Sequence, residues 1–217
     1  MAWIARYLPA VFLLVSGMLA AETLVTPRLT CEIAQTAEVA TLTARATGSA
    51  GQVVFRIEWT GSQAKAEDFR SKPSENGAIT STHRLGKTTI TRTILASGAA
   101  DCIMIHVIAD QPGAVSLNAH FVSKHPAQIL NRREILLSGE KIHAHAWILP
   151  FESDVHDDGK GTISLNGEGE ALIILNLTAD PQTIPISDTL KRLGKKYDPA
   201  HNPPGPHLIW EAVKPQR

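Results

Sequence analysis

A two-residue period in hydrophobicity recurs along the chain from residue 39 to residue 177. Val53, Phe55, Ile57 and Trp59 fall on one face of such a segment, and the charged Arg56 falls on the other. This alternation is typical of β-strands with one buried face, and helices repeat every 3.6 residues instead. The pattern predicts strong strands at 53–59, 88–95, 102–108, 115–121, 142–149 and 170–177, and weaker ones at 39–46, 79–85, 134–138 and 162–165.

Turn signals separate these segments. Gln111-Pro112-Gly113 places proline where φ is fixed and glycine where φ becomes positive, and Asn166-Gly167 suits a tight hairpin. The segment 62–77 is polar and predicts an exposed loop with a helical turn at 64–69. About ten short strands joined by such turns predict an all-β fold, a two-sheet antiparallel β-sandwich of the supersandwich type.

The first 21 residues predict a signal peptide. One charge, Arg6, precedes an apolar run that reaches Ala21, and cleavage after Ala20 or Ala21 is expected. An uncleaved N-terminal anchor is the alternative. No later segment is long and apolar enough to span a bilayer. We therefore expect an exported protein, periplasmic or extracellular.

The domain organisation follows from the remaining length. Residues 22–180 are expected to form the sandwich domain. Residues 181–217 predict a short helix at 187–196 followed by an irregular, proline-rich tail, in which Trp210 suggests packing against the domain. Removal of the signal peptide leaves 20 basic and 21 acidic residues. This balance gives no electrostatic reason to expect nucleic acid or an anionic membrane as a partner.

The chain contains two cysteines, Cys31 and Cys102. An exported protein meets oxidising conditions, so we expect a disulfide between them. Closing a loop of about 70 residues contributes roughly 4 kcal/mol when the bond is unstrained. Two buried thiols are the alternative.

His143, His145 and Trp147 lie two residues apart on the expected strand 142–149 and therefore share one face. The simplest interpretation is the polar outer face of a sandwich strand. A sugar-contacting surface is the functional alternative, with an exposed Trp147 packing against a pyranose ring and the histidines donating hydrogen bonds. A metal site with His120 or Asp157 as further ligands is a third interpretation, but no metal or other cofactor is expected.

Asp157 and Asp158 lie in a polar, glycine-flanked loop. Glycosidases need two carboxylates across the scissile bond, and adjacent loop residues do not provide this arrangement. A solvated turn is the favoured interpretation, with a weak calcium site as the alternative. The chain shows no nucleophile-elbow, zincin, phosphate-loop or dinucleotide motif, and no catalytic residue is assigned.

One stretch carries a family resemblance. A strand ends in Arg-x-x-aliphatic-Ala-Ser, an acidic residue follows, an apolar strand leads into Ala-Asp-x-Pro-Gly, and an alternating strand ends near a proline. These features are Arg92–Ser97, Asp101, Ile103–Ile108, Ala109–Gly113 and the stretch to Pro126, and Gly167–Asp180 adds a similar small-residue turn and apolar strand. Residues 80–180 thereby resemble the N-terminal β-sandwich domain of glycoside hydrolase family 95, the α-L-fucosidase and α-L-galactosidase family.

The resemblance implies a fold and a context. In that family the catalytic acid and base lie on a helical barrel that follows the sandwich, and no position here matches a catalytic motif. We therefore expect an exported, non-catalytic protein that binds carbohydrate or pairs with a separately encoded catalytic chain. The alternatives are a small metal-dependent or glycoside hydrolase that uses His143, His145 and the Asp157 loop, and a structural envelope protein.

Overall fold

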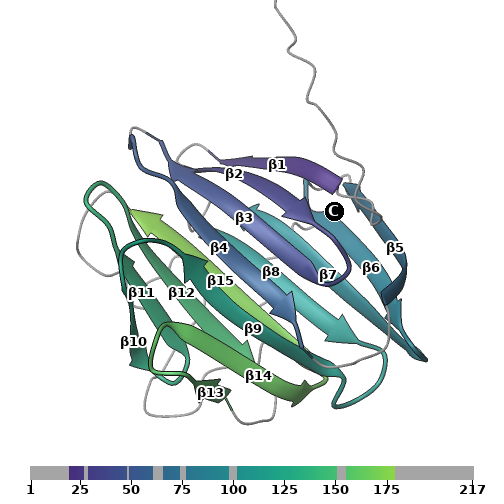
Figure 1. The fold of residues 1–217 in the computed structure, drawn as a ribbon. Coiled ribbons are helices and arrows are strands. Elements are labelled where there is room, and N and C mark those ends of the chain that lie inside the picture. Colours follow the sequence, from purple (N-terminus) through teal and green to yellow (C-terminus); the bar gives the residue numbers. More distant parts are fainter. Residues whose placement is uncertain are drawn as a thin grey trace, which may run out of the picture.

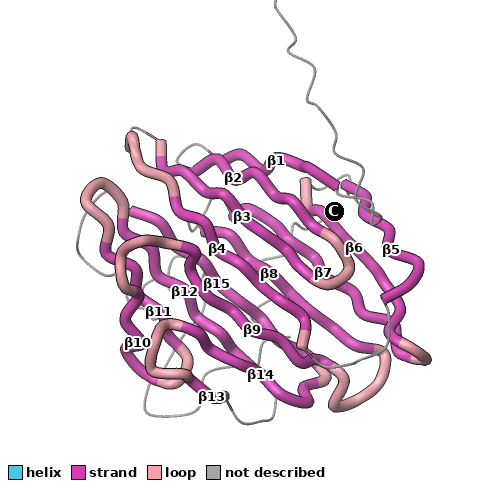
Figure 2. Tube along the Cα trace, in the orientation of Figure 1, coloured by secondary structure: helices cyan, strands magenta, loops and turns pink. Residues whose placement is uncertain are grey.

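A computed structural model describes residues 20–26, 29–47, 49–60, 66–73, 77–97, 102–150 and 155–178, which form fifteen β-strands (Figure 1). The described residues contain strands and loops and no helix (Figure 2). The strands are β1 (Ala20–Thr26), β2 (Leu29–Gln35), β3 (Val39–Ala46), β4 (Val53–Trp59), β5 (Ala66–Pro73), β6 (Ile79–Leu85), β7 (Thr88–Ser97), β8 (Cys102–Ala109), β9 (Val115–Val122), β10 (Ala127–Asn131), β11 (Glu134–Ser138), β12 (His143–Pro150), β13 (Val155–Asp157), β14 (Thr162–Glu168) and β15 (Glu170–Thr178).

The strands form two antiparallel sheets. The seven-stranded sheet has the order β1-β2-β3-β4-β9-β14-β13, and the eight-stranded sheet has the order β10-β11-β12-β15-β8-β7-β6-β5. The first lies in front of the second in Figure 1. Most sequence neighbours pair as hairpins, while pairings such as β4–β9 and β8–β15 join distant parts of the chain. The predicted two-sheet antiparallel sandwich is confirmed.

The main core lies between the two sheets. Alternate side chains of most strands point into it, as Val53, Phe55 and Ile57 do on β4. Phe55 packs edge-on against Phe121 of the neighbouring β9, with ring centroids 5.0 Å apart. Burying such side chains contributes about 1.5–3 kcal/mol each, which explains why this face is apolar throughout most of the sheet.

All ten predicted strands are present at or near the expected positions. Two predictions for the connecting segments are wrong. The segment 62–77 was expected to be a loop with a helical turn, but residues 66–73 form β5 at the edge of the eight-stranded sheet. Its polar side chains suit an exposed edge, and a bulge brings Asp68 to a φ of 55° and within 3.1 Å of Arg84. Gly167 occupies a bulge within β14 instead of a hairpin turn.

The predictions for the two ends lie outside the described residues. Residues 1–19 hold most of the predicted signal peptide, and residues 179–217 hold the predicted helix and tail. The strand β1 begins at Ala20, so the expected cleavage bonds lie within its first three residues. None of the described residues forms a helix long and apolar enough to cross a membrane.

Candidate functional site

The predicted binding residues of β12 are mostly buried. Trp147 and His145 lie on the face of the eight-stranded sheet that points away from the main core, but they are only 1% and 4% exposed. His143, on the same face, is half-buried. The prediction of an exposed Trp147 that receives a sugar ring is therefore wrong, because a solvent-shielded ring offers no surface to a ligand.

Trp147 belongs to a second hydrophobic cluster on this face. The strand register places one side chain from each of four adjacent strands in a row across this face. The row runs from Trp147 on β12 through Ile174 on β15 and Met104 on β8 to Leu95 on β7. All four side chains are almost fully buried, so both faces of the central strands are shielded from water. The cluster consists of Ala78, Leu95, Cys102, Met104, Trp147, Leu149, Leu172 and Ile174.

Two histidine–glutamate pairs lie on the same outer face. His145 Nε2 is 2.9 Å from Glu134 Oε2, and its ring packs on Trp147 with centroids 3.9 Å apart. His106 Nε2 is 2.7 Å from Glu170 Oε1. Both imidazoles are buried, and a buried polar group must be hydrogen-bonded to avoid a large desolvation cost. The structure thus accounts for His145 as part of a packed, hydrogen-bonded layer.

The alternative metal site is not assembled. His143 and His145 lie on the outer face of the eight-stranded sheet, whereas His120 and Asp157 belong to strands of the other sheet. The described residues contain no group of three histidine, cysteine, aspartate or glutamate side chains that could hold a metal ion. His143 and His145 therefore lie on a different sheet from Asp157.

The aspartates of this loop stabilise a turn. Asp157 Oδ1 accepts a hydrogen bond from the backbone N–H of Gly159 at 3.1 Å. Asp158 Oδ1 accepts from the backbone N–H groups of Lys160 and Thr162 at 2.7 and 2.9 Å. Partial burial raises the pKa of Asp158, but the hydrogen bonds from Thr162 and Lys160 outweigh it and the net pKa is lowered. This arrangement fits the predicted solvated turn.

The two cysteines lie in different hydrophobic clusters. Cys31 of β2 points into the main core, whereas Cys102 of β8 belongs to the cluster on the outer face of the eight-stranded sheet. The structure contains no disulfide between them. A disulfide needs Cβ atoms about 3.8 Å apart, and here the body of a sheet lies between the two side chains. Burial, together with the charge of Glu32, raises the pKa of the Cys31 thiol to about 12.

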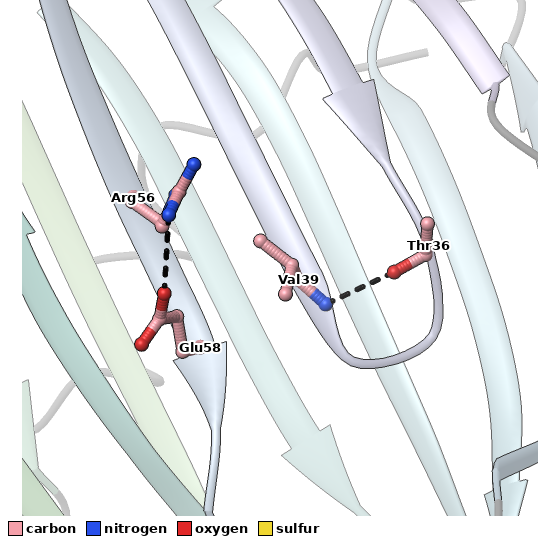
Figure 3. A network of polar contacts seen from close by, with 4 residues as sticks. All are labelled: Thr36, Val39, Arg56 and Glu58. Atoms are coloured by element: carbon pink, nitrogen blue, oxygen red, sulfur yellow. Dashed lines mark hydrogen bonds and ion pairs between the residues drawn. The ribbon is translucent and has the colours of Figure 1, made fainter.

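The outer face of the seven-stranded sheet is polar and partly exposed. Arg56 of β4 lies opposite His120 of β9, and one row further Glu58 lies opposite Asn118, which lies opposite Ser164 of β14. Arg56 Nη1 is 3.4 Å from Glu58 Oε1, and both side chains are about two-fifths exposed, at 41% and 37% (Figure 3). We call these five side chains the polar face.

Hydrogen bonding on the polar face is incomplete. Ser164 Oγ donates to Asn118 Oδ1 at 2.7 Å. Arg56 Nε and His120 Nδ1 have no hydrogen-bond partner among the described residues. Figure 3 also shows the nearby β2–β3 turn, where Thr36 Oγ1 accepts from the backbone N–H of Val39 at 3.2 Å. Arg56 Nε and His120 Nδ1 are both buried, so an external ligand would meet the partly exposed ends of the Arg56 and Glu58 side chains instead. Sequence alternation identified this face of β4 but did not show which strands lie beside it.

A buried polar network crosses the space between the sheets. Arg92 of β7 donates from Nε to Ser81 Oγ at 3.3 Å, and Ser81 donates to Gln35 Oε1 at 3.0 Å. Gln35 Nε2 donates to Ser71 Oγ at 3.0 Å, and Ser71 donates to Glu22 Oε1 at 3.2 Å. Every donor points from the guanidinium toward the carboxylate, so each hydrogen bond polarises the next in the same direction. The sequence placed Arg92 on a strand and in the motif that carries the family resemblance, and it gave no indication of this network.

Comparisons with known proteins do not place the chain in a family. No family model and no curated protein matches it. One solved structure, "Putative kojibiose phosphorylase from human microbiome", is similar in part, with 11% sequence identity and a TM-score of 0.38. The match covers 91% of this chain and 38% of that chain, so this chain spans well under half its length. The resemblance of residues 80–180 to glycoside hydrolase family 95 stays a prediction.

Proposed function

We propose that this chain is an exported, non-catalytic β-sandwich protein that binds carbohydrate through the polar face of its seven-stranded sheet. The observation that carries the proposal is the alignment of Arg56, Glu58, Asn118, His120 and Ser164 on three adjacent strands. Neighbouring strands lie about 4.8 Å apart, so these side chains form a flat array of donors and acceptors at closely spaced positions. Hydroxyl groups around a sugar ring require such an array of donors and acceptors.

The arrangement favours binding over catalysis. Glycoside hydrolysis uses two carboxyl groups on opposite sides of the scissile bond, one acting as an acid. On the polar face Glu58 is the single carboxylate among the five side chains, and it is paired with Arg56. The resemblance to the sandwich domain of a glycoside hydrolase family and the signal-peptide pattern of residues 1–21 support the same context, with a carbohydrate or a separately encoded catalytic chain as partner.

Binding of the purified protein to an array of immobilised glycans tests the proposal. Loss of one hydrogen bond to a sugar costs about 1.4 kcal/mol, or about tenfold in affinity. Arg56→Ala and His120→Ala should each weaken binding by at least this factor. Arg45→Ala, an exposed arginine on β3 outside the polar face, is the matched control and should leave binding unchanged.

Two results would contradict the proposal. One is binding to no glycan on the array, or glycan binding that neither Arg56→Ala nor His120→Ala weakens. The other is turnover of aryl glycosides by the purified chain, which would show that it is an enzyme. If the chain binds a helical-barrel hydrolase and no glycan, the accessory role is supported. The polar face is then not a carbohydrate-binding surface.

A further inference from the structure

The positive charge of Arg92 lies between the sheets, and no described residue provides a direct counter-charge. The side chain is 4% exposed, and its two described acceptors are the neutral Ser81 hydroxyl and the backbone carbonyl of Thr36, which accepts from Nη2 at 2.8 Å. Burial lowers the pKa of Arg92 to about 10. Buried charges in proteins are ordinarily paired, because an unpaired one pays the full cost of desolvation.

The carboxylate of Glu22 does not serve as the direct partner. It lies at the far end of the buried network, and three neutral side chains, Ser81, Gln35 and Ser71, separate it from the guanidinium. The network lets Glu22 polarise the hydrogen bond at Arg92 Nε. It leaves Arg92 Nη1 without an acceptor among the described residues.

Two further donors near Arg92 lack acceptors. Ser81 of β6 lies opposite Arg92, and His83 follows two residues later on the same inward face, so His83 is a diagonal neighbour of Arg92. His83 is 2% exposed, and neither of its ring nitrogens has a hydrogen-bond partner among the described residues. Trp59 packs edge-on against the His83 ring at 5.7 Å, and its buried Nε1 also lacks a partner.

These unpartnered donors indicate the chemistry of a ligand that could bind between them. Neutral imidazole and indole each offer one N–H, and Arg92 offers the N–H groups of Nη1. Water would accept these hydrogen bonds but would leave the guanidinium charge uncompensated. A planar carboxylate does both, because its two oxygens match the geometry of the guanidinium group. The low exposure of His83 and Arg92 restricts the site to a small group.

We propose that Arg92, His83 and Trp59 form an interlayer site that binds a carboxylate group of a small anion. This site lies inside the sandwich, apart from the polar face, and it does not depend on glycan binding there. The carboxylate can come from a free small acid, such as formate or acetate, or from an acidic sugar. Both sources present the same group to the three donors.

Thermal unfolding of the purified full chain tests the site. Formate, acetate, glucuronate and chloride are each titrated as sodium salts. Binding to the folded state alone raises the Tm with a saturable dependence on ligand concentration. We expect such a rise for formate and acetate if the source is a free acid, and for glucuronate if the source is a sugar. Trp59→Phe removes one N–H and keeps an aromatic ring, so it should weaken the apparent affinity severalfold. Arg92→Met should abolish the saturable rise, and the exposed Arg45→Met should retain it.

A second measurement keeps the test valid if Arg92→Met does not fold. The imidazole resonances of His83, assigned with His83→Phe, should shift on titration with the effective carboxylate in the wild-type protein. The proposal is overturned if no carboxylate gives a saturable rise, if Trp59→Phe responds as the wild type does, or if the His83 resonances stay unmoved at saturation. A response to chloride equal to that of the best carboxylate would also overturn it, because it would show a site for any small anion.

Discussion

Gln35 joins the two sheets through its side-chain amide, and its replacement by leucine gives the sharpest test of the buried network. Gln35 is the last residue of β2 and is 1% exposed. Its carbonyl oxygen accepts from Ser81 and its amide donates to Ser71, both at 3.0 Å. Leucine has a similar size, so the substitution removes two hydrogen bonds and creates little empty space.

The expected cost follows from these contacts. Each lost hydrogen bond costs about 1 kcal/mol, and the fully buried Ser81 hydroxyl left without its acceptor adds about 1–3 kcal/mol. Burial of the leucine side chain offsets part of this, so we expect a loss of about 2–4 kcal/mol. Adding Ser81→Ala removes the orphaned hydroxyl and should recover about 1 kcal/mol, because the two residues are in direct contact. The recovery stays partial, since Arg92 Nε also donates to Ser81.

Equilibrium unfolding in urea measures these values. With a slope of about 2 kcal/mol/M, the midpoint of Gln35→Leu should fall by about 1–2 M without a change in slope. Gln128→Leu is the matched control, because Gln128 lies exposed on the edge strand β10 and its replacement should change stability by less than about 0.5 kcal/mol. The network does not hold the sheets together if Gln35→Leu lowers the free energy of unfolding no more than Gln128→Leu does. The same conclusion follows if the loss in the double variant equals the sum of the losses in Gln35→Leu and Ser81→Ala.

Four further outcomes follow from the described contacts. Burial and the charge of Arg92 lower the pKa of His83 from 6.5 to about 4, so the unfolded chain binds more protons than the folded chain between these pH values. The free energy of unfolding should therefore fall as the pH drops from 6.5 to 4, by at most about 3 kcal/mol. His83→Phe should flatten this pH dependence. Trp147→Ala should lower the free energy of unfolding in urea by about 3–5 kcal/mol, because it leaves a cavity in the second hydrophobic cluster. Cys31 and Cys102 should resist alkylation in the folded protein and both react after unfolding without a reductant, as read by mass. Asp158→Ala should cost only about 1 kcal/mol in thermal unfolding, since it removes two exposed turn hydrogen bonds.

Several strands that the sequence predicted have an alternation that reflects one buried face. β3, β4, β6 and β11 begin and end at the predicted residues, because apolar and polar positions alternate along each. β5 was missed because it is an edge strand and buries neither face, so its side chains carry no apolar period. Its pairing with β6 depends on backbone hydrogen bonds and on the Arg84–Glu67 contact at 2.8 Å, which local hydrophobicity does not report.

The error at Trp147 has a different origin. Alternation shows which side chains share a face but not whether a second layer covers that face. A signal for covering was present in the neighbouring strands, since β8 and β15 are almost continuously apolar and are buried on both faces. β12 pairs with β15, so its outward side chains share the same shielded surface. Knowledge of the pairing, which is a long-range property, would have placed Trp147 inside.

Hydrophobic patterning also marks where the interior departs from simple packing. Gln35, Ser81, His83 and Arg92 all occupy inward positions at which alternation calls for apolar residues. Ile79, Ile90 and Ile94, inward residues of the same two strands β6 and β7, are buried as expected. A set of well-packed apolar residues is often at least as stable as buried ionic and polar groups, so stability alone gives no reason for this cluster. Local conflicts between pattern and fold are expected at functional sites. The concentration of four such residues on three strands, beside unpartnered donors of His83 and Trp59, is therefore the strongest indication within the described residues that the space between the sheets binds something.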